Sequence, residues 1–325
     1  MAVKKILGAI YEPRFLNCMY GFRPNRGCHE AIKEVYQRIS YGKISYIVDA
    51  DIKGFFDHID HEWMMKFLEW NIQDKNLLWL IRKYLKAGIM EQGKFEPTEE
   101  GSAQGSVMSP MLANIYMHHV LTLWFKLVVK KEMQGECFLV NFADDFVAGF
   151  QYKSEAERYY KELKERMEKF GLELEGSKSR LIEFGRFAEQ NRRARGECKP
   201  ETFDFLGFTF YCGRSRKGMP YIMPKTSSKK FRQKIRDIKV WLYANRDQPL
   251  KKLMGMLNLK LIGHYRYYGI SFNGRMISNY KQQVRELLFK VLNRRSDRKS
   301  YTREGFIEML KYYPLAMPKI YVSLF

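Results

Sequence analysis

The sequence predicts a mixed α/β domain followed by a basic helical module. Strand-like and helix-like hydrophobic patterns alternate over most of the 325 residues, but beyond about residue 228 only helical spacing remains. Positive charge is concentrated in the same late part: from Lys225 to the end there are 23 Lys and Arg against 6 Asp and Glu, a balance of +17. The boundary therefore falls near residues 212–228, where the linker candidate CGRSRKGMPYIMPKTSSKK is rich in Gly, Pro, Ser and Lys.

The elements of the first domain follow from hydrophobic spacing, turn residues and helix caps. We expect strands over 44–52, 172–184 and 202–212, and a hairpin whose arms are FLVNFA and FVAGF. Helices are expected over 61–72, 76–89, 110–131 and 154–171. The long helix begins at Pro110 behind the cap candidate Ser109, and Gly171 ends the helix that starts at 154.

The module after the boundary shows apolar residues at helical steps of three and four. One set is Phe231, Ile235, Ile238 and Leu242, and another is Ile277, Tyr280, Val284, Leu287 and Val291. Lys and Arg occupy the other faces of these helices, so the module is expected to be helical with a basic surface.

Composition narrows the class of protein. Hydrophobic residues make up 46% of the chain, with 21 Tyr and 23 Phe, which is typical of a folded protein. A net charge of +21 favours a polyanionic partner, nucleic acid first and an anionic membrane second. No transmembrane span or secretory signal is expected. The 5 scattered cysteines fit a reduced cytosolic interior and argue against a zinc site.

The segment FLVNFADDFVAGF, residues 138–150, places Asp144 and Asp145 inside an apolar run. Burying ionised carboxylates is costly unless they are paired or bind a metal. An earlier segment carries Asp49 and Asp51, which share one face of a strand. A pair of Mg²⁺ ions held ~3.5–4 Å apart for phosphoryl transfer would unite the two clusters. A solvated turn or a helix cap is the alternative, and residue chemistry leaves both open.

Several segments, read in chain order, resemble the ordered blocks of bacterial group II intron-encoded reverse transcriptases. They are YGFRPNRGCHEAI (20–32), DADIKGFFDHIDH (49–61), GSAQGSVMSPMLANIYMHHVL (101–121), FADD (142–145), GLELEGSKSRLIEFG (171–185) and FDFLGF (203–208). The tail from LIGHYRYYG onward resembles the thumb, or maturase, domain of the same enzymes. The resemblance covers nearly the whole chain.

The resemblance implies an α+β fold with the right-hand polymerase architecture. Residues 1–45 would form partial fingers, residues 46–222 the palm, an antiparallel sheet with helices and interleaved fingers elements, and residues 223–325 a basic α-helical thumb or maturase domain. It also implies a two-metal centre with Mg²⁺, for which Mn²⁺ substitutes.

Catalytic roles carried over by the resemblance fall on few residues. Asp51, Asp144 and Asp145 would hold the metals, with the main-chain carbonyl of Ile52 as a further ligand. Lys178 would neutralise or protonate the leaving pyrophosphate, although a surface lysine in a hairpin is the alternative. Asp49 is either a neighbouring acidic position or the partner of a lysine.

Four residues would contact the incoming nucleotide: Phe56, Gln104, Gly105 and Arg23. Phe56 matches the steric gate that rejects a 2′-hydroxyl, with a core aromatic as the alternative. Gln104 and Gly105 match positions that contact nucleotide and template. Arg23 would meet template backbone or triphosphate, unless it is simply solvated.

Primer and template contacts would come from two places. The turn FLG, which comprises Phe205, Leu206 and Gly207, resembles the primer grip. The thumb residues Lys229, Lys230, Arg232, Lys234, Arg236 and Lys239 would bind phosphates without reading sequence. Tyr265, Tyr267 and Tyr268 either stack on bases or line the helical core of the thumb.

The family pattern is broken in some places. The basic fingertip block expected before YGFRP is absent, so we expect either a truncated product, an upstream segment or separate chain that supplies it, or impaired catalysis. Phe142 stands where the signature has tyrosine, SAQG replaces TPQG, and KSR replaces KTR. We expect the protein to be without an endonuclease domain, and so not to cleave a target strand by itself.

The expected function is RNA-directed DNA polymerisation, with an RNA template, a DNA or RNA primer, dNTPs and intron RNA as partners and no membrane. The expected location is the bacterial cytoplasm, in association with the nucleoid. Two alternatives stay open: a non-enzymatic RNA-binding maturase that assists splicing, and a related protein used in host defence.

Overall fold

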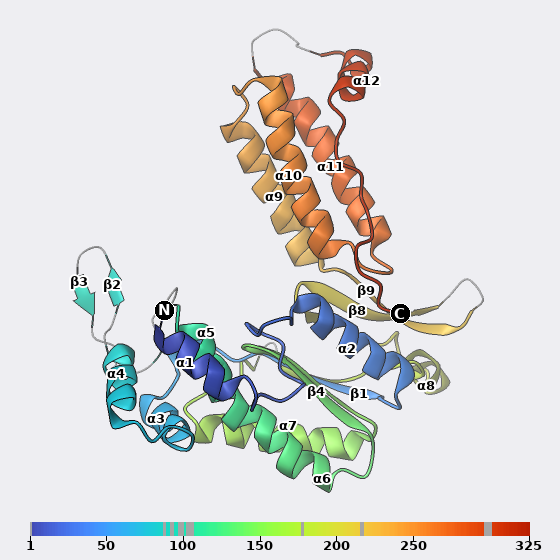
Figure 1. Ribbon diagram of the computed structural model, residues 1–325. Helices are drawn as coiled ribbons and strands as arrows, with labels where there is room; N and C mark the ends of the chain where they lie inside the picture. The colour runs from blue at the N-terminus through green and yellow to red at the C-terminus, as the bar shows by residue number, and fades with distance from the viewer. Residues whose placement is uncertain are drawn as a thin grey trace. The chain divides into compact units, whose positions relative to one another are not determined.

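The computed structural model describes residues 2–86, 89–91, 94–96, 101, 107–176, 179–214, 218–295 and 301–325 (Figure 1). The chain divides into two compact units. The first contains residues 1–206 and 212–222, and the second contains residues 207–211 and 223–325.

A four-stranded antiparallel sheet forms the centre of the first unit (Figure 1). Its strands are β1 (Tyr46–Ala50), β4 (Cys137–Phe142), β5 (Asp145–Phe150) and β6 (Arg180–Glu183), in the order β4-β5-β1-β6. Residues 146–150 of β5 are all buried, so both faces of this strand are covered by the rest of the unit.

Helices α2 (Cys28–Tyr41) and α7 (Lys153–Lys169) pack on this sheet, α2 beside β4 and α7 against β1, β5 and β6. The buried side of α7 follows helical spacing and consists of Ala156, Tyr159, Leu163 and Met167. Gly171 has a φ of +71° just beyond the helix, which confirms the predicted stop.

The long helix predicted after residue 110 is present as Ser109–Glu132. It comprises α5 (Ser109–Met117), two π-helical segments (His118–Thr122 and Phe125–Val129) and α6 (Lys130–Glu132). Ser109 is not the cap: it is the first helical residue, Met108 occupies the cap position, and Pro110 lies in the first turn. The helix is long and apolar enough to cross a membrane by composition, but 72% of its apolar window is buried inside the protein.

The remaining described elements of the first unit surround this core. They are α1 (Ala2–Tyr11), the 3₁₀ turn Phe55–Asp57, α3 (His61–Glu69), α4 (Lys75–Leu85), β2 (Ile89–Glu91), β3 (Lys94–Glu96) and α8 (Ala188–Ala194). The side chains of Asp60 and Asp74 accept hydrogen bonds from backbone N–H groups at the starts of α3 and α4.

Three expectations need correction, two about strands and one about the linker. The strand expected over 172–184 is limited to β6, preceded by an isolated bridge at Leu174. The strand expected over 202–212 is instead two strands, β7 (Phe203–Phe205) and β8 (Phe208–Arg214), joined by a turn at Leu206 and Gly207. The linker expected near 212–228 contains the end of β8 and all of β9 (Pro220–Thr226), and β8 pairs with both β7 and β9. The prolines of β9 are tolerated because it is an edge strand.

The second unit is helical, as predicted (Figure 1). Its helices are α9 (Ser228–Ala244), α10 (Leu250–Tyr268), α11 (Gly274–Leu292) and α12 (Arg303–Tyr312), and α11 packs against both α9 and α10. Most residues of the predicted apolar sets are buried, but Leu288 replaces Leu287 as the buried leucine of α11. Asn273 is fully buried before α11, where its amide donates to the Thr226 hydroxyl and to the Tyr268 carbonyl.

Candidate active site

The acidic pair lies at the tip of the hairpin formed by β4 and β5. Phe142 pairs with Asp145, which leaves Ala143 and Asp144 as the two residues of the turn. Most of the strand residues are buried, whereas Asp144 is half-buried and Asp145 is exposed. The predicted hairpin is therefore confirmed, and it carries both carboxylates to one end of the central sheet.

Strand β1 brings the earlier acidic cluster to the same end. It runs antiparallel to β5, and Ala50 pairs with Phe146. Asp51 directly follows the last residue of β1, and Asp145 is the first residue of β5, just before Phe146. The two clusters, which are far apart in the sequence, therefore follow on from the same pair of strands.

The backbone of Asp51, just beyond β1, is held by Glu175 and Ser179. Its carbonyl oxygen accepts a 2.8 Å hydrogen bond from the N–H of Glu175, and its own N–H donates to the Ser179 hydroxyl at 3.3 Å. Ile52 forms a bridge with Leu174. The position of Asp51 is thus set by backbone contacts that do not involve its carboxylate.

The surroundings of the turn oppose ionisation. Burial raises the pKa of Asp144 above its ordinary value of 3.8, and the negative charge of Asp51 raises it further, while a backbone hydrogen bond lowers it. A divalent cation would reverse the two raising effects, because it replaces lost hydration and neutralises the repulsion between the carboxylates.

Asp49 lies beside this pair on β1, opposite Arg180 of β6. Burial raises the pKa of Asp49 to about 7, Arg180 opposes that shift, and the charges of Asp204, Asp145 and Asp51 add to it. The Nε of Arg180 lies 3.8 Å from Oδ2 of Asp49. The cation partner that the sequence allowed for Asp49 is therefore an arginine.

The donor set of the site fits magnesium. The described part of the chain holds no group of three His, Cys, Asp or Glu side chains arranged to bind a metal ion unaided. Mg²⁺ needs only one or two protein carboxylates, because water and substrate phosphates supply its other ligands. Asp51 and Asp144, with a main-chain carbonyl such as that of Ile52, are oxygen donors of that kind.

Phe56 lies in the 3₁₀ turn that follows β1. Its ring is partly buried against the core and stands edge-on to Phe55, with the ring centroids 5.3 Å apart. A packing role and a gate beside the nucleotide sugar both agree with this placement. The contact of Phe56 with a sugar therefore stays a prediction.

The block that begins at Gly101 is anchored close to Phe56. The Gly101 N–H donates to the Ile59 carbonyl at 2.9 Å, and its carbonyl accepts from the His61 ring at 2.6 Å. An added Cβ at Gly101 would lie 3.0 Å from the Phe56 carbonyl oxygen. Three predicted residues lie outside the described part of the chain: Gln104, Gly105 and Lys178.

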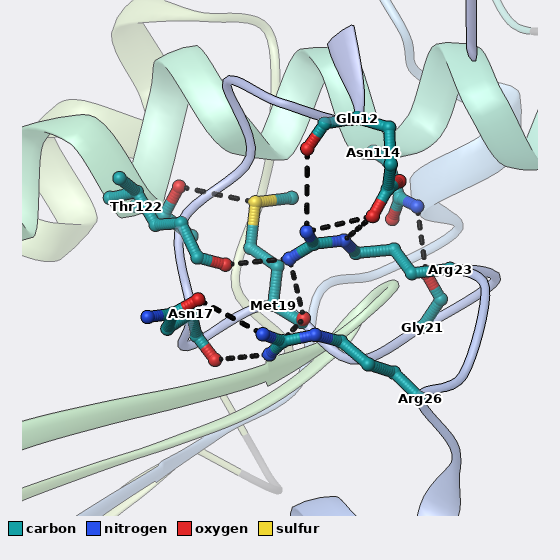
Figure 2. Close-up of polar contacts among 9 residues, drawn as sticks. Glu12, Asn17, Met19, Gly21, Arg23, Arg26, Asn114 and Thr122 are labelled. Carbon is teal, nitrogen blue, oxygen red and sulfur yellow. Dashed lines mark hydrogen bonds and ion pairs between the residues drawn. The ribbon is translucent and has the colours of Figure 1, made fainter. Parts of the chain in front are cut away.

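Arg23 is turned into the protein (Figure 2), and its side chain is 6% exposed. It pairs with the Glu12 carboxylate at 2.8 Å and donates to the carbonyls of Leu16 and Met19 at 2.7 and 3.0 Å. This arrangement corrects the expectation of a solvated arginine. It favours a structural role over the predicted contact with template or triphosphate.

The predicted primer grip is a tight turn between β7 and β8. Leu206 and Gly207 have φ values of +48° and +79°, as a two-residue type I′ hairpin requires. Glycine adopts such a φ easily, whereas a leucine there is strained, and such strain is frequent at functional sites. Phe205 is buried. The contact of the turn with a primer stays a prediction.

The outer side of α9 carries the predicted cations. All six are exposed: Lys229, Lys230, Arg232, Lys234, Arg236 and Lys239. Three of them line a surface depression of about 660 Å³, together with Phe231, Ile235 and Gln283. Exposed cations around a surface depression are suited to a phosphate backbone.

The tyrosines of α10 separate into two groups. Tyr265 and Tyr268 are 0% and 4% exposed and belong to the core of the second unit. Tyr267 is partly buried and stacks on Phe208, with ring centroids 5.9 Å apart. This corrects the expectation that Tyr265 stacks on bases, because its ring has no exposed face, and core packing is the alternative that holds.

Two buried asparagines next to the turn were missed by sequence reasoning. Asn141 of β4 is 0% exposed and its amide contacts the turn, while Asn114 of α5 is 1% exposed and binds the loop beside it. The signal for Asn141 was present in FLVNFADD, where a lone amide interrupts an apolar strand two residues before the turn.

The fold is that of reverse-transcriptase-like polymerases. The structure is similar to that of the telomerase from Candida albicans, solved with a fragment of telomeric RNA, with a TM-score of 0.50. The match covers 95% of this chain and 53% of the telomerase chain. The two sequences are 13% identical, so the likeness concerns the fold alone.

The chain belongs to the reverse transcriptase (RNA-dependent DNA polymerase) family, which residues 1–210 match. Residues 228–307 match the group II intron, maturase-specific domain. These matches confirm the resemblance read from the ordered blocks and from the tail.

Curated relatives match over a shorter stretch. The group II intron-encoded protein LtrA of Lactococcus lactis subsp. cremoris is 41% identical over 134 residues, which is 41% of this chain and 22% of LtrA. Protein YkfC of Escherichia coli (strain K12) is 36% identical over 112 residues, 34% of this chain and 29% of YkfC. The matched part of the chain thus spans less than a third of either relative.

Proposed function

We propose that this chain is an RNA-directed DNA polymerase that adds deoxynucleotides to a primer 3′-hydroxyl on an RNA template. The observation that carries the proposal is that Asp51, Asp144 and Asp145 follow on from paired strands at one end of the central sheet. Membership of the reverse transcriptase family supports the same activity.

Asp51 and Asp144 would hold Mg²⁺, or Mn²⁺ in its place, with Asp145 beside them. Two bound ions supply activation of the attacking hydroxyl and stabilisation of the leaving pyrophosphate. In the reaction the primer 3′-hydroxyl loses its proton to water, its oxygen bonds to the α-phosphorus of the nucleotide, and the bond from that phosphorus to pyrophosphate breaks. The chain contributes carboxylates that the sheet keeps in position, so little reorganisation is needed.

The surrounding residues would select and hold the substrates. Phe56 would lie under the nucleotide sugar and exclude a 2′-hydroxyl, and Gln104 and Gly105 would contact the nucleotide and template. Lys178 would neutralise pyrophosphate. The turn at Leu206 and Gly207 would hold the primer end.

The basic face of α9 would bind the phosphates of the template and primer. Its exposed cations and the depression beside them support this assignment. The match to the maturase-specific domain supports intron RNA as the natural template or partner.

The proposal is tested by primer extension on an RNA template with dNTPs and Mg²⁺. Asp144→Asn is compared with Glu165→Gln, which also removes one carboxylate charge but from an exposed position on α7. We expect Asp144→Asn to abolish extension and Glu165→Gln to extend like the wild type. Full extension by Asp144→Asn would refute the proposal.

A second candidate function is RNA binding that assists splicing without polymerisation. The specific observation in its favour is that residues 228–307 match the maturase-specific domain and include all of α9. Splicing of a group II intron precursor RNA in the presence of the Asp144→Asn protein separates the two functions. Splicing support without any extension by the wild type would favour the RNA binder.

A further inference from the structure

The turn that carries Asp144 has a strained backbone. Ala143, the first residue of the turn, has a φ of +56°. This left-handed region is unfavourable for any residue with a Cβ, because the Cβ crowds the following carbonyl oxygen. Some other contact must therefore hold the turn in this shape.

Asn141 supplies one such contact. Its amide Nδ2 donates a 2.7 Å hydrogen bond to the carbonyl oxygen of Ala143, two residues later in the chain. Its own backbone is fixed, since its N–H donates to the Cys18 carbonyl and its carbonyl accepts from the N–H of Tyr20, both at 2.8 Å. The side-chain oxygen of Asn141 has no hydrogen-bond partner among the described residues. The N–H donor is therefore the part of the buried amide group that bonds to the turn.

The loop that contains Gly21 lies directly against the turn. A Cβ added to Gly21 would lie 2.6 Å from the backbone nitrogen of Ala143, a distance that side chains essentially never reach. The Gly21 carbonyl accepts a 2.7 Å hydrogen bond from Nδ2 of the buried Asn114 (Figure 2). Helix α5 therefore holds Gly21 against the turn.

The same loop is anchored at a second point by the partly buried ion pair of Arg23 and Glu12 (Figure 2). Arg23 also binds the carbonyls of Leu16 and Met19, and Met19 forms a bridge with Asn141. One connected set of contacts thus runs from Arg23 through the loop to β4 and the turn.

We propose that Asn141 and Asn114 are positioning residues, which hold Ala143 in its left-handed conformation and so fix the direction of the Asp144 carboxylate. Neither side chain needs to touch substrate or metal. The proposal deepens the polymerase function above and rests on it for its effect on catalysis, while the effect on the turn itself is independent of activity.

The first experiment combines Asn141→Ala with Ala143→Gly. Loss of the Asn141 donor is expected to lower kcat of primer extension about 10- to 100-fold with the KM for dNTP unchanged, because a misplaced carboxylate weakens the transition state alone. Glycine adopts a positive φ without strain. The double variant is therefore expected to recover about tenfold in kcat relative to Asn141→Ala.

Tyr11→Phe is the matched control. It also deletes a buried hydrogen bond from a side chain to a carbonyl in the first unit, in this case the 3.0 Å bond from the Tyr11 hydroxyl to the Phe67 carbonyl. We expect it to lower stability without a change in kcat. Wild-type kcat in Asn141→Ala, or an equal loss in Tyr11→Phe, would overturn the proposal, and so would a failure of Ala143→Gly to restore activity.

The second experiment measures amide hydrogen exchange of the peptide that spans residues 138–150. Asn141→Ala and Asn114→Ala are each expected to speed exchange in this peptide and leave α7 at its wild-type protection. Unchanged exchange in both variants contradicts the proposal whether or not the protein polymerises. A wild type that does not extend primers while exchange responds as expected would contradict the polymerase function alone.

Discussion

The acidic end of the central sheet and the basic face of α9 use charge in opposite ways. At the sheet, carboxylates are crowded and partly buried, and the pKa values of Asp144 and Asp49 are raised. On α9, six cations stand exposed to solvent. Ionisation of the carboxylates at the sheet therefore costs free energy, which a bound cation would reduce. The cations on α9 are already solvated, so their ionisation has no such cost.

This difference teaches which kind of failure to expect from each region. Residues that act as one unit at fixed geometry lose function together, so their effects are not additive. Exposed cations that contact phosphates act independently, and each adds a small, salt-dependent share of affinity. Mutation of the sheet should change turnover, and mutation of the helix should change binding.

The largest effect is expected at the carboxylates. Asp51→Asn should lower kcat of primer extension by at least about 10³-fold, and the double variant with Asp144→Asn should be hardly worse than either single variant. Fluorescence anisotropy with an RNA–DNA primer duplex should show nearly unchanged binding. If the fold-loss of kcat in the double variant equals the product of the two single losses, the two carboxylates act separately.

A smaller and graded effect is expected on α9. Replacement of three cations around the depression by Gln (Lys229, Arg232 and Arg236) should weaken duplex binding about 10- to 100-fold and reduce the salt slope by about 0.7–0.9 per lost contact. Turnover at saturating duplex should stay close to wild type. The control removes three exposed lysines of α7 (Lys161, Lys164 and Lys169), and an equal loss there would mean that net charge alone drives binding.

A matched pair of glycine substitutions compares packing in the two units. Gly21→Ala should destabilise the first unit by about 1–3 kcal/mol, because its Cβ would meet the Ala143 backbone nitrogen at 2.6 Å. Gly263→Ala on α10 meets nothing within 4 Å and should stabilise the second unit by about 0.5–1 kcal/mol. Thermal unfolding of both variants shows whether each substitution stabilises or destabilises the protein. A stabilising Gly21→Ala would contradict the close approach of Gly21 to the Ala143 backbone.

The smallest effect at neutral pH is expected from His264. Burial, with a contribution from the charge of Lys234, lowers the pKa of this imidazole from 6.5 to about 3. Between those pH values the unfolded chain binds the extra proton, so the stability is complete above pH 6.5 and falls by about 1.4 kcal/mol per pH unit below it. His264→Phe keeps a ring against Tyr280 and should flatten that acid loss, measured by denaturant unfolding at pH 7 and pH 5. An unchanged pH dependence would mean that other groups carry it.

Sequence patterns predicted much of the site but not its support. The apolar flanks of Asp144 and Asp145 indicated a hairpin, and the spacing along β1 indicated where Asp51 would emerge. The sequence predicts a solvated or substrate-binding Arg23, because nothing close to it in the chain reveals that Glu12 and two carbonyls surround it. Tyr265 was ambiguous for the same reason, since an aromatic residue at helical spacing serves a core or a surface equally well.

The linker error has a similar origin. Gly, Pro, Ser and Lys between residues 212 and 228 indicated a break in structure, but β9 forms there because β8 offers it an edge to pair with. A strand forms only where another strand pairs with it, so the sequence of a segment predicts a strand less reliably than it predicts a helix.

Hydrophobic periodicity and the order of short motifs were sufficient to predict the mixed α/β domain, the helical module after it, the family and the acidic centre. These properties depend on residues close together in the chain, whose spacing sets which side chains share a face. The contacts made by Asn141, Gly21 and Asn114 are known only from the tertiary structure, because they join the loop before α2, the helix α5 and the tip of the hairpin. Contacts between such distant segments are set by packing in three dimensions, which no local pattern records.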